Sequence, residues 1–304
     1  MRIVIVKKRT LILMGVVLLA LILAVIAAAA AGRGHGQAEG QGQGEKEKTS
    51  VAPAMGGNGV GEYELNVLAG RQRELPVYCV ERSDKALALT VDAAWDDDKT
   101  AFILKTLKQH DVVATFFLCG VWVDAYPAYV KQIAEEGHEI GNHSKTHPHM
   151  NQLDAAGVQQ EIRALDDDIE ALTGKRCTLF RAPFGEYNDT VIRAVREIGY
   201  EPIQWNIDTI DWKRERSAET ILNAVLPKLS PGSILLCHNN GYEIEDYLPP
   251  LIEKAQAEGY TFVTVSELLL SGSTAIDANG MQKPASGEAK TPAPSAAPTK
   301  EPSA

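Results

Sequence analysis

Two histidines that stand four residues apart have the spacing of a metal-binding pair. His143 and His147 begin and end the segment His-Ser-Lys-Thr-His, and one helical turn or a tight loop would aim both imidazoles at one ion. Imidazole nitrogen is a common ligand of divalent transition metals, so the pair indicates metal-assisted chemistry. The plain alternative is a solvated surface turn, which is the interpretation that we adopt for the neighbouring His149.

Other residue types that could do acid, base or binding chemistry follow short apolar runs. They are Asp92, Arg181, the pair Asp211-Trp212, and His238. Taken alone, Asp92 could cap a helix, Arg181 could pair on the surface, and Trp212 or His238 could be a core side chain. Together they follow successive predicted strands at the same end, and this pattern indicates one shared site.

The elements that must position these residues are alternating strands and helices. The strands that we predict cover residues 86–91, 112–118, short stretches near 139 and 179, 201–204, 233–237 and 261–265. The two clearest helices run through Val158, Ile162, Leu165, Ile169 and Leu172, and through Val191, Val195 and Ile198. Gly174 should end the first helix, and Asn188 or Asp189 should cap the second.

This alternation predicts an α/β fold with a parallel sheet. About seven strand-helix units over roughly 200 residues favour a small or incomplete (β/α) barrel over an open doubly wound sheet. No G-x-G-x-x-G follows the first strand, so a dinucleotide-binding fold is disfavoured. In a barrel the chemistry gathers at the carboxyl ends of the strands, where the unusual residues of this sequence lie.

Both ends of the chain have compositions that cannot bury a core. Residues 11–31 form an uncharged run preceded by Arg2, Lys7, Lys8 and Arg9. At about 1.5 Å per residue the run reaches roughly 30 Å, enough to cross a bilayer, and its basic flank predicts that the rest of the chain lies outside the cytoplasm. We therefore expect a membrane anchor over residues 1–31. A cleavable signal peptide is the alternative, because small residues at 27–31 offer a cleavage site.

Residues 32–73 are rich in Gly, Gln, Glu and Lys and predict a flexible linker. Residues 272–304 combine prolines with Ala, Ser, Thr and Lys and predict a disordered tail. One catalytic domain over 74–271 is left between them. The formal net charge of −10 argues against nucleic acid as a partner. Four cysteines lack the close spacing of a metal site, and we expect free buried thiols.

Taken together, these motifs resemble those of the NodB-homology polysaccharide deacetylases, the family 4 carbohydrate esterases. The resemblance covers about Glu74 to Leu270 and rests on H-S-x-x-H, R-x-P-x-G, D-x-x-D-W and an apolar strand that ends in His. It implies a distorted (β/α)7 barrel and hydrolysis of N-acetyl groups on amino sugars. The expected substrate and partner is a cell-wall glycan, with peptidoglycan preferred over a chitin-like polymer, and the expected state is a monomer.

The resemblance also implies roles for individual residues. Asp92 matches the general base, Arg181 the residue that orients it, His238 the general acid, and Asp211 the carboxylate that holds the imidazole of His238. His143 and His147 match the ligands of one divalent metal ion, which we expect to be zinc, with cobalt, nickel or manganese as alternatives. The match further implies that the backbone N–H of Phe184 faces the developing oxyanion, and that Pro183, Trp212 and Leu236 contact the substrate.

The first motif departs from the family pattern. The family has T-F-D-D-G with its second Asp as the third metal ligand, whereas this chain reads Thr-Val-Asp92-Ala93-Ala-Trp. Ala93 cannot bind a metal. A carboxylate from Asp96, Asp97 or Asp98 could replace it, Asp92 could lie closer to the ion, or the two histidines and water could hold the metal weakly. Of the carboxylates we select Asp98. The D-A-A-W form resembles a branch among sporulation-associated and clostridial-type deacetylases.

Two other functions are compatible with these residues. The missing Asp would suit a wall-binding protein that has lost tight metal binding and most of its activity. A binder, however, needs neither a base with its orienting arginine nor a separate acid, so the retained set favours an enzyme. An amidase or esterase that acts on another acyl group is the second alternative.

Overall fold

The computed structural model describes residues 73–96 and 99–285. The strands are β1 (Cys79–Val80), β2 (Ala86–Ala93), β3 (Thr115–Leu118), β4 (Glu139–Asn142), β5 (Leu179–Phe180), β6 (Glu201–Pro202), β7 (Ile207–Asp208), β8 (Ile234–His238), β9 (Thr261–Phe262), β10 (Thr274–Ile276) and β11 (Met281–Pro284). The α-helices are α2 (Thr100–Gln109), α3 (Gly120–Ala125), α4 (Pro127–Glu135), α5 (Ala155–Thr173), α6 (Asp189–Glu197), α7 (Ala218–Val225), α8 (Ile244–Ala257) and α9 (Val265–Leu268). Short 3-10 turns cover Met150–Gln152, Pro183–Gly185 and Leu226–Lys228.

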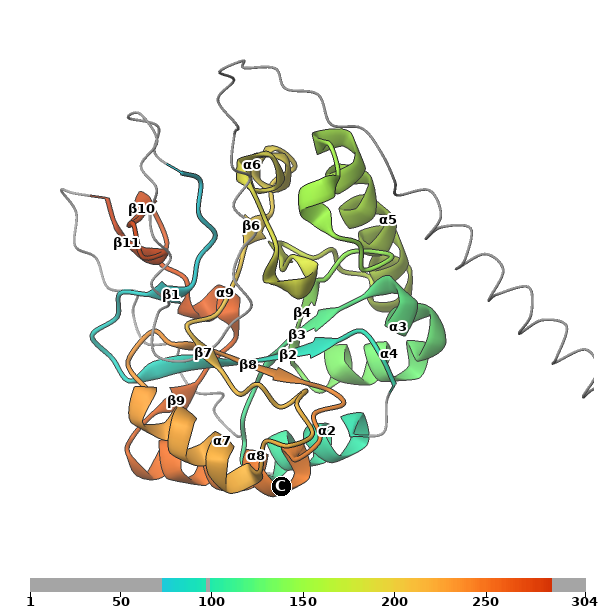
Figure 1. The fold of residues 1–304 in the computed structure, drawn as a ribbon. Helices are drawn as coiled ribbons and strands as arrows, with labels where there is room; N and C mark the ends of the chain where they lie inside the picture. The colour runs from blue at the N-terminus through green and yellow to red at the C-terminus, as the bar shows by residue number, and fades with distance from the viewer. Residues whose placement is uncertain (1–72, 97–98, 286–304) are drawn as a thin grey trace, which may run out of the picture. The chain divides into compact units, whose positions relative to one another are not determined.

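A curled parallel sheet forms the centre of the fold. Its strands run in the order β6-β5-β4-β3-β2-β8-β7, and β9 pairs with the start of β2. The helices lie around the outside of this sheet (Figure 1). Within the described residues β6 and β7 do not pair with each other, so the barrel is incomplete. The predicted (β/α)7 barrel is therefore confirmed in its distorted, open form.

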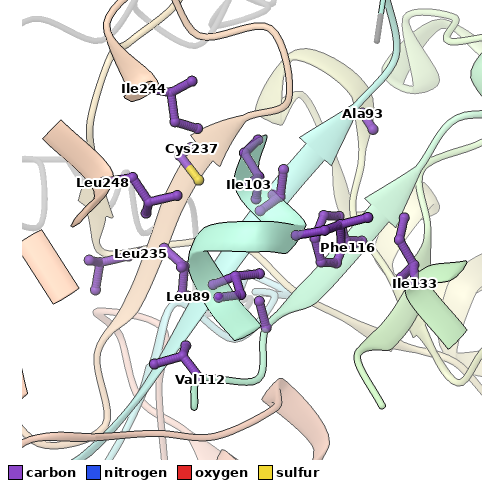
Figure 2. Packing of buried hydrophobic residues seen from close by; sticks show 14 of the residues in the cluster. Leu89, Ala93, Ile103, Val112, Phe116, Ile133, Leu235, Cys237, Ile244 and Leu248 are labelled. Atoms are coloured by element: carbon purple, nitrogen blue, oxygen red, sulfur yellow. The ribbon is translucent and has the colours of Figure 1, made fainter. Parts of the chain in front are cut away.

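Alternation along the strands separates two apolar clusters. The outer cluster joins the sheet to its helices and includes Leu89, Phe116, Leu235, Cys237, Ile103, Ile133, Ile244 and Leu248 (Figure 2). The inner cluster fills the concave side and includes Ala88, Phe117, Leu179, Ile203, Trp205, Ile234 and Leu236. Because side chains alternate along a strand, Asp92, Arg181 and His238 share the inner side with Ala88, Leu179 and Leu236.

The helix ends follow the expected local chemistry. Asp154 caps α5 by accepting a hydrogen bond from Gly157 N at 2.8 Å, and Gly174 ends it at φ 73°. Asn188 caps α6 by accepting from Val191 N at 3.0 Å. Both predicted helices are thus confirmed. The last strand is shorter than predicted, because Thr264 caps α9 through its hydrogen bond from Glu267 N.

The prediction of a disordered tail from residue 272 is wrong for its first part. Residues of β10 and β11 form an antiparallel hairpin, and β11 also pairs in parallel with β1. The Gln282 side chain is 5 % exposed and accepts a hydrogen bond from Leu270 N at 2.8 Å, which ties the hairpin to the end of α9. The prediction treated residues 272–304 as one segment, but most of its prolines lie beyond the hairpin, at 292 and later.

Other predicted segments lie outside the described residues. They are the membrane segment 1–31, the linker 32–73 except Arg73, and the tail from 286 onward. Among the residues that the structure does describe, no helix is long and apolar enough to cross a membrane. The four cysteines Cys79, Cys119, Cys177 and Cys237 are free and buried, as predicted.

Candidate active site

Asp92 lies on the inner side of β2, close to the strand's carboxyl end. The residue is 6 % exposed, and its Oδ1 accepts a hydrogen bond from Arg181 Nη1 at 2.6 Å. Burial alone would raise the pKa of Asp92, but the charge of Arg181, helped by nearby imidazoles, holds this pKa below its usual value. Asp92 is therefore an ionised carboxylate at neutral pH.

Arg181 is fully enclosed and fixed from several sides. Its Nη1 also donates to Thr90 Oγ1 at 2.9 Å, and its Nη2 donates to Gln204 O at 3.1 Å. The guanidinium lies over the ring of Phe117, 4.0 Å from the centroid. Since the side chain is 0 % exposed, Arg181 can orient Asp92 but cannot reach a ligand outside the sheet.

His143 turns one ring nitrogen toward Asp92. Its Nδ1 lies 2.9 Å from Arg181 O, a partner that can only accept, so Nδ1 carries the proton and Nε2 presents a lone pair. Nε2 is 3.7 Å from Asp92 Oδ2. Burial lowers the pKa of His143. A neutral imidazole whose second nitrogen donates to a carbonyl is the usual arrangement of a metal-binding histidine.

His147 lies against His143, with 5.0 Å between the ring centroids. Its backbone is left-handed at φ 59°, and its N–H donates to Ser144 Oγ at 3.1 Å. Burial, followed by the charge of His143, lowers the pKa of His147 to about 4. Its Nδ1 is buried and has no hydrogen-bond partner among the described residues. A tight loop, one of the two geometries considered above, thus brings the two imidazoles together.

These imidazoles fit a divalent metal ion as two of its ligands. Both are held neutral, and His147 has a ring nitrogen that lacks a partner in the described part of the chain. In residues 73–96 and 99–285, no group of three or more metal-binding side chains is already assembled. Asp97 and Asp98 lie outside the described residues, and Asp98 stays a prediction. Ala93 belongs to the outer cluster and faces away from the site.

A second buried carboxylate, Asp211, holds His238 at the end of β8. His238 Nδ1 lies 2.7 Å from Asp211 Oδ1, and the backbone N–H of His238 donates to Asp211 Oδ2 at 3.0 Å. Tyr247 of α8 donates its hydroxyl to the same Oδ2 at 2.6 Å. Position 241 must be glycine, because a Cβ there would come within 2.2 Å of Asp211 Oδ2.

This arrangement favours the protonated imidazole. Burial by itself would lower the pKa of His238, but the hydrogen bond and the charge of Asp211 outweigh burial and raise the pKa to about 9. His238 thus carries a proton at neutral pH, unlike His143 and His147. The His238 side chain is 24 % exposed, so its proton is accessible to a ligand at the carboxyl edge of the sheet.

The sheet register brings the carboxylate of Asp92 and the imidazole of His238 to one place. β2 and β8 are adjacent parallel strands, and Asp92 is the direct register partner of His238. Both residues point to the inner side, as their alternation with Ala88 and Leu236 requires. An ionised carboxylate and a protonated imidazole therefore stand side by side at the carboxyl edge, which is the pairing that general base and general acid catalysis needs.

The residues predicted to contact substrate divide into two groups. Phe184 and Trp212 are exposed at 55 % and 54 %, so Trp212 is not a core residue. Pro183 is buried, and Leu236 is 2 % exposed within the inner cluster. Phe184 adopts φ 60° and packs its ring against His147, 4.6 Å between centroids. Only the first two present large surfaces to a ligand.

Sequence reasoning missed three residues that hold the site: Tyr247, Thr90 and Gln204. Thr90 had a usable signal, since it precedes Asp92 by two residues on a strand and must share its face. Tyr247 had none, because it comes from a helix nine residues beyond His238 and looks like an ordinary apolar position. Gln204 binds through its backbone carbonyl, which residue type does not reveal.

Comparison with known proteins agrees with this geometry. Residues 80–203 match the family described as "Polysaccharide deacetylase". The chain is 36 % identical over 203 residues to a peptidoglycan-N-acetylglucosamine deacetylase of Bacillus cereus, covering 62 % of this chain and 91 % of that protein. The chain belongs to the polysaccharide deacetylase family. Because the chain belongs to this family, it is a hydrolase, and more specifically a deacetylase.

Two further relatives of this deacetylase have been assigned different activities. The peptidoglycan-N-acetylmuramic acid deacetylase PdaA of Bacillus subtilis is 29 % identical over 195 residues, covering 63 % of this chain and 74 % of PdaA. A solved structure from Bacillus anthracis, described as a CE4 family pseudoenzyme, superposes with a TM-score of 0.61 at 35 % identity, covering 64 % of this chain and 68 % of that one. A mutant of that pseudoenzyme is described as having restored enzymatic activity. Activity among these relatives therefore varies with substitutions in the same fold.

Proposed function

We propose that this chain removes acetyl groups from the N-acetylated amino sugars of peptidoglycan. One observation carries the proposal: Asp92 and His238 stand at paired positions of β2 and β8 in opposite protonation states. Each has its own buried partner that maintains its state, Arg181 for Asp92 and Asp211 for His238. Hydrolysis of an amide needs both a base for water and an acid for the amine.

In the proposed reaction Asp92 accepts a proton from the attacking water. The water oxygen forms a bond to the acetyl carbonyl carbon, and the backbone N–H of Phe184 donates to the oxygen that becomes negative. His238 then donates its proton to the sugar nitrogen as the carbon–nitrogen bond breaks. Collapse gives acetic acid and the free amine, and the acid proton passes to the amine, so that acetate and an ammonium sugar leave the site. The proton held by Asp92 passes through solvent to His238, which restores the starting state of both residues.

His143 and His147 would hold the divalent metal ion, with Asp98 as the proposed carboxylate ligand and zinc as the expected metal. Cobalt, nickel or manganese would suit the same donors. When bound, such an ion would supply positive charge that lowers the pKa of a water molecule and stabilises a developing oxyanion. The neutral state of both imidazoles and the buried Nδ1 of His147 support this part of the proposal.

A polymer suits the surface around these groups. The large exposed apolar side chains of the described residues are Trp95, Val121, Phe184, Trp212 and Tyr242. Each follows the carboxyl end of a parallel strand, namely β2, β3, β5, β7 and β8 in that order. Aromatic faces at the rim can stack on successive sugar rings. We propose that Trp212 and Leu236, with Pro183, shape the place of the acetyl methyl group.

Acetate release tests the proposal. The full chain is incubated with peptidoglycan fragments and with chitooligosaccharides, before and after removal of metal by a chelator and after addition of zinc. We expect acetate from peptidoglycan fragments, loss of release on chelation, and recovery with zinc. Acetate from neither polymer would contradict the proposal, and release of a different acyl group would favour an amidase or esterase.

The metal ligands have their own test. His143→Ala and His147→Ala should each abolish tight zinc binding while the circular dichroism spectrum is kept, since both lie at the edge of the sheet. His110→Ala is the matched control, because His110 lies at the end of α2 and its ring contacts Glu253 at 3.9 Å. Zinc content that is unchanged in both site variants would rule out this ligand pair.

We further propose that the chain works outside the cytoplasm, anchored by residues 1–31. The uncharged run 11–31 and its basic flank support this location. The full chain should sediment with membranes and resist extraction by high salt, and a chain that starts at residue 32 should be soluble. Recovery of the full chain in the soluble fraction with residues 1–31 removed would instead identify a cleaved signal.

A glycan-binding protein with little activity is the second candidate. Ala93 in place of the family's Asp and the 35 % identity to a pseudoenzyme favour it. The retained pairs Asp92–Arg181 and Asp211–His238 oppose it, because binding needs neither. Tight binding of peptidoglycan fragments without any acetate release, with zinc present, would select this function.

A further inference from the structure

The loop after β7 carries three cations beside the proposed acid. Lys213, Arg214 and Arg216 follow Trp212 directly. None of them forms an ion pair with another described residue, and the Nε of Arg216 is buried without a hydrogen-bond partner there. This is unusual in a protein whose formal net charge is −10, because acidic partners are abundant. We call these three residues the basic rim.

Two cations of the basic rim lie on exposed aromatic rings. Lys213 Nζ is 5.0 Å from the centroid of Trp212, and Arg214 Cζ is 4.9 Å from the centroid of Tyr242. Trp212 is 54 % exposed and Tyr242 is 48 % exposed. The stacking restrains both cations without neutralising them, so their charges stay available to an anion.

The backbone fixes the basic rim next to the site. Trp212 follows Asp211, whose carboxylate holds His238. Tyr242 N donates to Asp211 O at 3.0 Å, which joins the loop after β8 to the loop after β7. Arg216 N donates to Lys213 O at 3.0 Å and closes a turn within the rim. The two aromatic rings and their cations are therefore carried on the two loops that also hold Asp211 and His238.

Nearby carboxylates do not cancel this charge by contact. Glu215 and Glu243 are the acidic neighbours in sequence, and neither pairs with a cation of the rim. Glu245 is engaged by Lys99 instead. A ligand with a carboxylate near a sugar ring fits this combination, since the ring can stack on Trp212 or Tyr242 while the carboxylate meets Lys213 and Arg214.

We propose that the basic rim binds a carboxylate carried by the glycan beside the sugar that is deacetylated. This inference rests on the proposed function, because it takes the ligand to be a wall glycan. It assigns Lys213 and Arg214 as specificity residues that favour a carboxylated polymer over a neutral one. The carboxylate has two sources in peptidoglycan: the lactyl group of a peptide-free N-acetylmuramic acid, or the peptide stem.

The test compares glycan fragments that carry or lack that charge, and the acid and its methyl ester are the matched pair. Calorimetry measures binding of the full chain to a peptide-free tetrasaccharide containing N-acetylmuramic acid, to its methyl ester, to chitotetraose, and to a peptide-bearing fragment. We expect one of the carboxylated fragments to bind about tenfold more tightly than the uncharged ones, the size of one charge-assisted contact. Preference for the peptide-free acid over its ester identifies the lactyl group, and preference for only the peptide-bearing fragment identifies the stem.

Variants decide whether the basic rim is responsible. Lys213→Gln/Arg214→Gln should reduce the preference to within about twofold while binding of chitotetraose is unchanged. The control Lys131→Gln/Lys175→Gln removes two exposed cations that also lack ion pairs among the described residues, and it should keep the preference. Equal affinity for charged and uncharged fragments in the wild type, or a preference that survives the rim variant, would overturn the proposal. Because binding does not require turnover, a chain that releases no acetate but keeps the preference would refute only the proposed function.

Discussion

The two buried carboxylates of the site, Asp92 and Asp211, differ chiefly in their partners. Asp92 is 6 % exposed and binds Arg181 at 2.6 Å, whereas Asp211 is 0 % exposed and binds His238 at 2.7 Å. A guanidinium keeps its proton at any ordinary pH, so Asp92 stays ionised and free to accept a proton on its other oxygen. An imidazole can release its proton, so Asp211 maintains a donor.

Exposure separates the two cations further. Arg181 is 0 % exposed and packs on Phe117, so it acts only through Asp92. The His238 side chain is 24 % exposed and reaches the substrate side. Similar carboxylate–cation pairs thus serve opposite purposes, according to which member faces the ligand and whether the cation can release its proton.

Removal of the base gives the largest expected effect. Asp92→Asn keeps the size of the side chain but cannot accept the proton of the attacking water, and acetate release should fall by about two to four orders of magnitude. Asp124→Asn is a matched control on α3, where Asp124 pairs with Lys145 at 2.8 Å near the surface. Activity of Asp92→Asn within a few-fold of wild type would transfer the role of base to a carboxylate in 96–98.

Removal of the permanent cation should lower stability as well as activity, and stability is the more specific measurement of the buried pair. Arg181→Met leaves Asp92 buried without its partner, and we expect the free energy of unfolding to drop by about 3–5 kcal/mol. Arg193→Met breaks an exposed pair with Asp189 at 3.4 Å and should cost about 0–1 kcal/mol. Urea unfolding followed by tryptophan fluorescence measures both. Equal losses in the two variants would mean that the buried pair does not stabilise the fold more than a surface pair.

The smallest effect belongs to Tyr247. Its hydroxyl shares Asp211 Oδ2, so Tyr247→Phe leaves more negative charge for the imidazole and should raise the pKa of His238 slightly. The alkaline limb of the pH profile of acetate release should move up by about half a pH unit, with turnover within a few-fold of wild type. A shift to lower pH would show that the hydroxyl supports the imidazolium by another route.

Parts of this site follow from sequence and others do not. Asp92, Arg181 and His238 were predictable because each follows an apolar run of strand type, and parallel strands bring such ends together. Tyr247 was not, because it lies on a helix that packs on the outer face, and a tyrosine in a helical apolar pattern carries no sign of a bond to Asp211. The third metal ligand stays a prediction, because the sequence at 96–98 carries no strand or helix pattern that would say where its carboxylates point.

The hairpin of β10 and β11 shows a signal that we overlooked. Asn279-Gly280 is a typical hairpin turn, and Gly280 adopts φ 78°. We predicted disorder from the composition of residues 272–304 and gave the Asn279-Gly280 turn no weight, because the segment around it is short and polar. Its pairing partner, β1, lies 202 residues away in sequence, from Cys79 to Met281, which local patterns cannot reveal.

The pH profile of kcat/KM in wild type and Asp211→Asn is the most direct test of the two roles, with Asp92 as the base and Asp211 as the carboxylate that keeps His238 protonated. The profile reports the free enzyme, so the rate should rise as the base ionises and fall as His238 loses its proton, with the alkaline limb near the pKa of about 9. Asp211→Asn removes the charge that raises this pKa, so the alkaline limb should move to lower pH while the acidic limb stays nearly fixed. A variant that shifts neither limb, or only the acidic one, would contradict the assignment of His238 as an acid maintained by Asp211.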